Sequence, residues 1–272
     1  MGQRFVYLAF DNIKKCFYKK TTLISIIGLA FILGYSAATF MIEESSLKVQ
    51  FSSNDYVIYF FNDFIISGIF LGVLFIISLV GMFWGNGINY MWISRLSGFK
   101  DVFRLFALSI FLWVICYMTF VVCLVFMVGG IIKEYSSHWS SGAVEVTLQK
   151  EFLRIDTIYS PTQTIIVSIW MVTMLLLIIG FLFYIGYCFT KGIGLGIFIN
   201  FIVFGISAVV YLFDLSWVYK GIPNINALFT LHSHKIPNYP TLEYSFFFIL
   251  GIITVLLVTS CVLSKKYLRI EI

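Results

Sequence analysis

The chain has 272 residues, of which 60% are hydrophobic and only 11% are charged, and its formal net charge is +5. Soluble domains carry about 25% charged residues, so this composition excludes a soluble globular protein and predicts a multi-pass membrane protein. Because most of the length is needed to cross lipid, we expect no fused catalytic or nucleotide-binding domain, which would take ~100 residues.

The first predicted element is an amphipathic helix over residues 4–20. This stretch carries five cations and one acid. Its apolar residues recur at spacings of four, three and four, and they are Val6, Phe10, Ile13 and Phe17. An apolar stripe bordered by cations is typical of a helix that lies in the membrane interface. We therefore predict an interfacial helix before the chain enters the bilayer.

Six apolar runs follow, each long enough to cross the ~30 Å hydrocarbon core as a helix. They cover residues 22–42, 64–85, 105–132, 165–190, 192–213 and 244–264. The predicted fold class is therefore an all-α membrane protein. Six transmembrane helices, preceded by the interfacial helix, form one transmembrane domain over residues 1–272.

The positive charges of the connecting segments are unequally divided between the two sides of the membrane. Twelve of the 18 Lys and Arg residues fall on one side, in residues 1–21, 86–104, 191 and 265–272. Cytoplasmic loops are enriched in Lys and Arg. We therefore predict a multi-pass protein of the cell membrane with both termini in the cytoplasm, and the abundance of Lys, Phe and Ile favours a bacterial source.

The basic segment between the second and third spans is the most informative connection. At helical spacing one of its faces is apolar. That face consists of Ile88, Met91, Trp92 and Leu96. Asn86 precedes it, Arg95 turns away from it, and Gly98 is placed to end the helix in the left-handed conformation. The segment is predicted to be a short helix on the cytoplasmic membrane surface, where a soluble partner can press on it; the alternative is an ordinary interfacial loop.

The interiors of the predicted spans contain no Asp, Glu, Lys, Arg or His, and Asp63 and Asp214 stand at their outer ends. Ion-driven carriers and intramembrane catalysts usually hold such groups near the midplane, so we predict no coupling to an ion gradient. Hydroxyl and amide side chains in the spans suit helix packing or a path for amphipathic cargo. The candidates for a cargo path are Tyr117, Tyr184, Tyr187, Asn200 and Tyr211.

Two outer connections, residues 133–164 and 214–243, are too long to be simple turns. The second is rich in aromatic residues and proline, and we expect it to fold back over the bundle. His232 and His234 alone make a poor metal site, and no nucleotide-binding or hydrolase motif occurs. We therefore predict no catalytic, cofactor-binding or metal-binding residues. The five cysteines are interpreted as apolar fillers, with lipidation of Cys16 as the alternative.

The basic amphipathic helix, the six spans and the segment after span two together resemble an ABC-2 type permease, over nearly the whole chain. The resemblance makes residues 4–20 the elbow helix on the membrane surface. Residues 86–97, followed by Gly98-Phe99-Lys100, are similar to the coupling helix, with Asn86 where many members have an acidic residue. The resemblance implies that this segment contacts the ATPase through the residues described above: Asn86, Ile88, Met91, Trp92, Arg95, Leu96 and Gly98.

The resemblance also implies a function. The chain would be the permease subunit of an ABC transporter and not itself an enzyme, because a separate cytoplasmic ABC ATPase subunit would bind and hydrolyse ATP. A second permease subunit, identical or related, would complete the path, within the lipid bilayer and without nucleic acid. Small permeases rich in aromatic residues are most similar to exporters of drugs, antimicrobial peptides or other amphipathic cargo. The alternatives are a non-transporting membrane scaffold or sensor subunit and, third, a lipid-modifying membrane enzyme.

Overall fold

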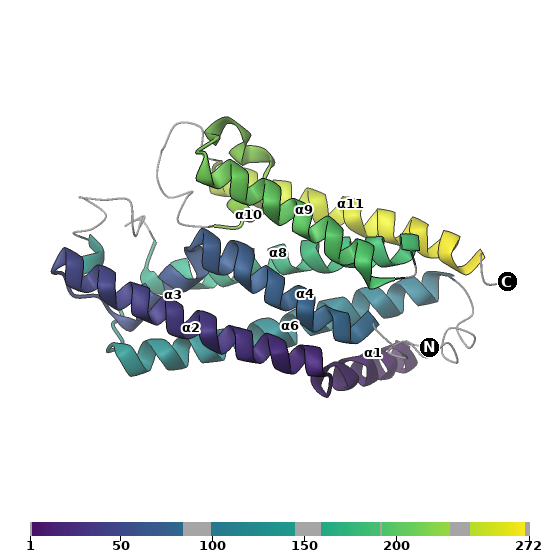
Figure 1. Cartoon of the computed structure of the whole chain (residues 1–272), viewed down its shortest axis with the longest axis horizontal. Coiled ribbons are helices and arrows are strands. Elements are labelled where there is room, and N and C mark those ends of the chain that lie inside the picture. Colours follow the sequence, from purple (N-terminus) through teal and green to yellow (C-terminus); the bar gives the residue numbers. More distant parts are fainter. Residues whose placement is uncertain (1, 84–98, 145–158, 191, 229–239, 270–272) are drawn as a thin grey trace.

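The computed structural model describes residues 2–83, 99–144, 159–190, 192–228 and 240–269, and these contain helices and no strand (Figure 1). In chain order the elements are α1 (Gly2–Phe17), α2 (Lys20–Leu47), α3 (Ser53–Asn62), the π-helix η1 (Phe64–Phe70), α4 (Leu71–Phe83), α6 (Phe99–Ile132), α8 (Pro161–Thr190), α9 (Ile193–Leu212), the 3-10 helix η2 (Ser216–Gly221), α10 (Pro223–Asn226) and α11 (Leu242–Arg269). The predicted fold class is confirmed: this is an all-α membrane protein.

Six of the described helical segments are long and apolar enough to cross a membrane. They are Lys20–Leu47, Phe64–Phe83, Lys100–Ile132, Pro161–Thr190, Ile193–Leu212 and Leu242–Lys265. The third segment begins several residues before the predicted residue 105. Its first turn is polar: Asp101 pairs with Arg104 at 3.7 Å, one turn further on. Charged side chains in this turn support the helix beyond its apolar part without entering the hydrocarbon.

The helices α4 and α8 form the centre of the bundle, and α2, α9 and α11 form its flanks. The apolar windows of the α4 and α8 spans are 72% and 61% buried, against 22% to 28% for the three flanking helices. In Figure 1, α9 and α11 run along one edge and α2 along the opposite edge. The flanking helices are apolar all round, so their outer faces suit contact with lipid.

Glycines on either side of the turn that joins α8 and α9 let these two helices approach closely. A Cβ atom on Gly186 would lie 2.5 Å from the Cα atom of Gly196, and one on Gly196 would lie 2.6 Å from the Phe183 carbonyl oxygen. No side chain fits into either position. The hairpin therefore depends on these two glycines.

Both chain ends lie at the same end of the bundle, as six crossings require (Figure 1). We call this the terminal end: it holds the start of α1, the end of α4, the start of α6 and the end of α11. The opposite end is the loop end. The segments 48–52 and 133–144 lie there with η2 and α10.

The second span is preceded by a helix that we did not expect. Residues 43–63 were predicted to be an outer connection, but they contain α3, of which every residue from Ser53 to Phe61 is buried. The helix ends where Asp63 adopts an extended conformation. The Asp63 carboxylate then accepts a hydrogen bond from the Ile66 amide at 2.7 Å and so starts η1.

The segment after α9 folds back over the loop end, as we expected from its composition. Phe64, Val210, Tyr219 and Ile225 belong to a separate apolar cluster beneath it. Asn224, which is fully buried, fastens this cap, because its amide donates to the Gly68 carbonyl and its side-chain oxygen accepts from the Ser207 hydroxyl at 3.1 Å. The cap is therefore tied to both η1 and α9.

A second buried asparagine holds the cap to the last span. The Asn226 amide donates to the backbone oxygens of Tyr219 (2.9 Å) and Ile222 (2.8 Å), and its side-chain oxygen accepts from the Ser245 hydroxyl at 2.6 Å. Buried amides with all groups paired fix one arrangement of the elements that they join. The turn between α9 and η2 also uses Asp214, whose φ is +48°.

Candidate functional site

The predicted ATPase contact lies outside the described residues. It comprises Asn86, Ile88, Met91, Trp92, Arg95, Leu96 and Gly98. The structure does place its two flanks, since α4 ends at Phe83 and α6 begins at Phe99, both at the terminal end. The coupling helix itself stays a prediction.

The amphipathic helix α1 packs against α6 and α4, the two helices that flank residues 84–98. Of its predicted stripe, Ile13 is buried, whereas Val6, Phe10 and Phe17 are 44% to 54% exposed. The residues that join Ile13 on the packed face are Ala9 and Cys16, both fully buried. The helix therefore has two apolar faces: one contacts the bundle and one points outward.

Two side-chain contacts fix α1 on α6. The Asn12 amide donates to the Ser109 hydroxyl at 3.3 Å, and the ring of Phe17 meets Trp113 edge-on, with 5.1 Å between the ring centroids. Edge-to-face pairs of this kind contribute about 0.5–1.5 kcal/mol beyond the stabilisation that comes from the area they bury.

Burial raises the pKa of the Cys16 thiol to about 12. A buried protonated thiol is a poor nucleophile, so this geometry favours the filler role of Cys16 over lipidation.

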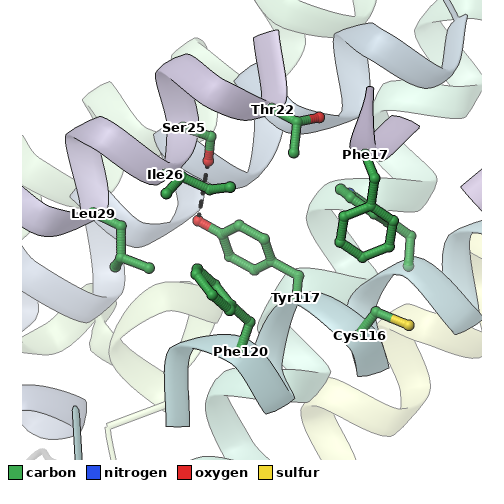
Figure 2. Close-up of a pocket in the computed structure, with 9 residues that line it drawn as sticks. Phe17, Thr22, Ser25, Ile26, Leu29, Cys116, Tyr117 and Phe120 are labelled. Atoms are coloured by element: carbon green, nitrogen blue, oxygen red, sulfur yellow. Dashed lines mark hydrogen bonds between the residues drawn. The ribbon is translucent and has the colours of Figure 1, made fainter. Parts of the chain in front are cut away.

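A narrow crevice opens on the flank of the bundle where α1, α2 and α6 meet (Figure 2). It encloses about 50 Å³. Its lining residues are Phe17, Thr22, Ser25, Ile26, Leu29, Trp113, Cys116, Tyr117 and Phe120. Tyr117, one of the predicted cargo-path residues, lies at its base, where its hydroxyl is 3.5 Å from that of Ser25.

Two other predicted cargo-path residues, Tyr184 and Tyr187, belong to one aromatic cluster near the terminal end. Both rings lie within 4.7 to 6.3 Å, between centroids, of the rings of Phe83 and Phe106. The Tyr184 hydroxyl also lies 2.6 Å from the Ser264 hydroxyl on α11. The cluster therefore joins the ends of α4, α6 and α8 to the last span.

The last two predicted cargo-path residues lie apart from this cluster. Asn200 is buried on α9 and donates to the Gly196 carbonyl of its own helix at 2.9 Å. Tyr211 is 36% exposed and stacks on Phe64 at the loop end, with 4.1 Å between the ring centroids. The five residues therefore occupy four separate places, and only Tyr184 and Tyr187 come together. A cargo path through them stays a prediction.

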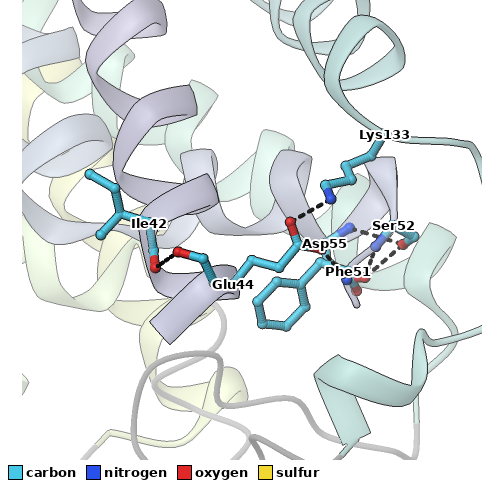
Figure 3. A network of polar contacts seen from close by, with 7 residues as sticks. Ile42, Glu44, Phe51, Ser52, Asp55 and Lys133 are labelled. Carbon is cyan, nitrogen blue, oxygen red and sulfur yellow. Dashed lines mark hydrogen bonds and ion pairs between the residues drawn. The ribbon is translucent and has the colours of Figure 1, made fainter. Parts of the chain in front are cut away.

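A polar network at the loop end was not predicted (Figure 3). The Glu44 carboxylate at the end of α2 forms an ion pair with Lys133, which follows α6, and its other oxygen accepts from the Phe51 amide at 3.0 Å. The side chains of Lys133 and Glu44 are only 23% and 13% exposed. One carboxylate therefore joins α2, the segment after it and the end of α6.

The same network contains Asp55, which is fully buried. Its carboxylate accepts from the Ser52 amide and hydroxyl, both at 2.7 Å, and the Ser52 hydroxyl in turn accepts from the Asp55 amide, so the two form a capping box at the start of α3. Desolvation raises the pKa of Asp55, opposed by hydrogen bonds from Ser52 and Ser140. Desolvation also raises the pKa of Asp63.

Backbone contacts extend this network to the segment after α6. The Ser53 amide donates to the Glu134 carbonyl at 2.9 Å, the Gly142 amide donates to the Gln50 carbonyl at 3.1 Å, and the Asn54 side chain donates to the Ser136 carbonyl. We call the contact of residues 48–55 with residues 133–143, together with the Glu44–Lys133 ion pair, the loop-end clamp.

One signal in the sequence points to this region: Ser52 and Asp55 stand at the spacing of a capping box, just before the apolar run 56–61. The pattern predicts the start of a helix. It gives no sign that the helix is buried, because the partners of its polar groups stand about 80 residues away.

Comparison of the chain with family models, with curated proteins and with solved structures finds no match. The family therefore stays a prediction from the resemblance described above.

Proposed function

We propose that this chain is the membrane-spanning permease subunit of an ATP-driven ABC transporter. The observation that carries the proposal is the seating of α1. This amphipathic helix packs on both α4 and α6, and residues 84–98, the predicted coupling segment, connect these same two helices. A push on the segment would therefore be passed to these two helices and, through them, to α1.

The outward face of α1 supports a place for this helix at the membrane surface. Val6 and Phe10 are exposed on it, next to the packed face, and Lys14 is exposed as well. Helices with an apolar side and a basic side lie in the interface. An interfacial helix anchored to α4 and α6 gives the coupling segment a fixed support against which a partner can act.

The distribution of ionisable residues supports an external energy source. The carboxyl groups of Asp55, which is buried, and of Asp63, which is half-buried, lie at the loop end, where each caps the start of a helix. Between residues 64 and 83, and from Pro161 to Thr190, the two central spans contain no Asp, Glu, Lys, Arg or His. In our proposal, ATP hydrolysis by a cytoplasmic ABC ATPase subunit drives the transport step.

We also propose a second permease subunit, identical or related, and an amphipathic cargo such as a drug or an antimicrobial peptide, moved by export. The broad apolar outer faces of α9 and α11 suit contact with lipid or with a second permease. Aromatic residues are abundant in the spans, and apolar cargo favours such surroundings. Both termini would be cytoplasmic, in a bacterial cell membrane.

The test is whether the predicted coupling segment holds an ATPase. The tagged chain is purified from its native membranes in a mild detergent, and the vanadate-sensitive ATP hydrolysis that purifies with it is measured. Trp92→Ala combined with Leu96→Ala should lower this activity about thirtyfold, because truncation of a buried anchor costs ~2 kcal/mol. The control is Phe31→Ala combined with Met127→Ala, two truncations at positions that are 76% and 60% exposed on α2 and α6.

The proposal fails if the activity is equal in both double variants. Purification without any ATPase would instead support the non-transporting scaffold or sensor subunit.

A further inference from the structure

The crevice of Figure 2 is an apolar slot along the first part of α2 (Figure 2). Its α2 lining runs from Thr22 to Leu29, about 10 Å along the helix axis at 1.5 Å per residue. These residues are the first turns of the span that begins at Lys20. The slot therefore lies parallel to the span, within the leaflet next to α1.

The polar atoms that line the slot already have partners inside the protein. The Thr22 hydroxyl donates to the Cys16 carbonyl at 2.6 Å, and the Ser25 hydroxyl donates to the Leu74 carbonyl at 2.9 Å. The Trp113 indole donates to Ser78 at 3.0 Å. The Tyr117 hydroxyl, as described above, lies beside that of Ser25. A polar occupant would gain little hydrogen bonding, whereas hydrocarbon would leave every one of these bonds intact.

The size of the slot limits the shape of its occupant. Its enclosed volume of about 50 Å³ is well below the ~150 Å³ of a cavity that admits benzene. A ring or a compact drug does not fit inside. Ile26 and Phe120, at 37% and 39% exposed, leave the slot open on the flank of the bundle. A slender chain can therefore lie along the slot with part of its width in the open mouth.

Positive charge gathers at the end of the slot that is nearer the membrane surface. Lys19 lies in the turn between α1 and α2, Lys20 is the first residue of α2, and Lys14 is exposed one turn before Phe17. No acid occurs from residue 12 to residue 42. Basic residues at a membrane surface attract anionic lipid head groups.

We infer that the slot between α1, α2 and α6 binds one acyl chain of an anionic phospholipid, whose head group lies near the lysines of the α1–α2 turn. The chain fills the gap between the interfacial helix and the first span. Lipid at this position stabilises the seating of α1 on the bundle. This inference does not rest on the proposed transport function.

Two native cysteines of α6 allow a direct test. Cys116 lines the slot, whereas Cys123, two turns further along the same helix, is exposed and does not line it. The full chain is stripped of lipid in detergent, and the rate at which N-ethylmaleimide modifies each thiol is measured by mass spectrometry while phosphatidylglycerol is added. Modification of Cys116 should slow about tenfold when phosphatidylglycerol occupies about nine slots in ten, because only chains with an empty slot then react. Modification of Cys123 should not change.

A matched pair of variants checks that the slot is responsible. Ile26→Trp places a large side chain at the mouth, and Ile27→Trp places the same side chain on the adjacent, 49% exposed position outside the slot. Protection of Cys116 should be lost in the first variant and kept in the second. Phosphatidylcholine should protect Cys116 less than phosphatidylglycerol.

Three results would overturn the inference. The first is a rate for Cys116 that phosphatidylglycerol does not change. The second is equal protection of Cys116 and Cys123, which would mean general solvation by lipid. The third is protection of Cys116 that Ile27→Trp abolishes as fully as Ile26→Trp.

Discussion

The loop-end clamp leads to a quantitative prediction about the Glu44–Lys133 ion pair. The Glu44 and Lys133 side chains are 13% and 23% exposed, so the burial of this pair is intermediate. Exposed ion pairs contribute about 0–1 kcal/mol to stability, whereas disruption of a fully buried pair costs about 3–5 kcal/mol. We expect Glu44→Gln to lower the free energy of unfolding by about 2 kcal/mol. Lys133→Met should cost a similar amount.

The contribution of the hydrogen bond from the Phe51 amide to Glu44 can be measured separately from the contribution of the charge. Glutamine keeps an oxygen that can accept from the Phe51 amide, whereas Glu44→Ala removes the acceptor as well. The alanine variant should therefore lose about 1 kcal/mol more than the glutamine variant. In the double variant Glu44→Gln with Lys133→Met, the two costs should overlap, with a coupling energy of about 1–2 kcal/mol.

The assay is reversible unfolding in mixed detergent micelles, followed by tryptophan fluorescence. Glu43→Gln is the matched control on the preceding residue, and we expect it to change the free energy of unfolding by less than about 0.5 kcal/mol. Strictly additive costs for Glu44→Gln and Lys133→Met would refute the argument, because they would mean that the two side chains do not interact.

Three further predictions concern the loop end and the topology. Because the pKa of Asp55 is raised in the folded chain, the folded state holds this proton more tightly than the unfolded state, and the free energy of unfolding should fall as the pH rises through the folded-state pKa. Asp55→Asn should reduce this pH dependence in unfolding measured between pH 4 and pH 8. An unchanged pH dependence would contradict the assignment. Asn224→Leu should lower the free energy of unfolding by about 2–4 kcal/mol, because it leaves the Gly68 carbonyl and the Ser207 hydroxyl without these partners; a loss below about 0.5 kcal/mol would mean that the cap is held by its apolar contacts alone. Cysteines introduced in a cysteine-free background at Ser46 and Ser141, both exposed, should react with an impermeant maleimide in intact cells, and labelling only after lysis would reverse the topology.

Much of the fold follows from the sequence because the bilayer imposes strict length and polarity requirements. An apolar run such as residues 165–190 has few alternatives to a spanning helix. The stripe of α1 shows the limit of this argument. Lipid and protein interior are both apolar, so the periodicity of Val6, Phe10 and Phe17 cannot tell which face packs on the bundle. That choice depends on small residues, Ala9 and Cys16, which let α1 approach α6 and α4.

The loop-end clamp could not be predicted for a related reason. Residues 43–63 contain acids, serines and two asparagines, which are typical of a solvated connection. Their burial depends on partners distant in the sequence: Lys133 for Glu44, and the Ser136 carbonyl for Asn54. Pairing between segments about 80 residues apart leaves no periodic signal, whereas the local capping box at Ser52 does.

The most direct test of the proposed function measures cargo flux in proteoliposomes that contain this chain and the ATPase that purifies with it, with fluorescent amphipathic drugs and peptides as probes. Flux should stop with a hydrolysis-deficient ATPase and should continue when an ionophore collapses the proton gradient. Flux that the ionophore abolishes and the deficient ATPase leaves unchanged would contradict the account. It would identify a carrier driven by an ion gradient, with the buried Asp55, the half-buried Asp63 and the boundary Asp214 as the first residues to substitute.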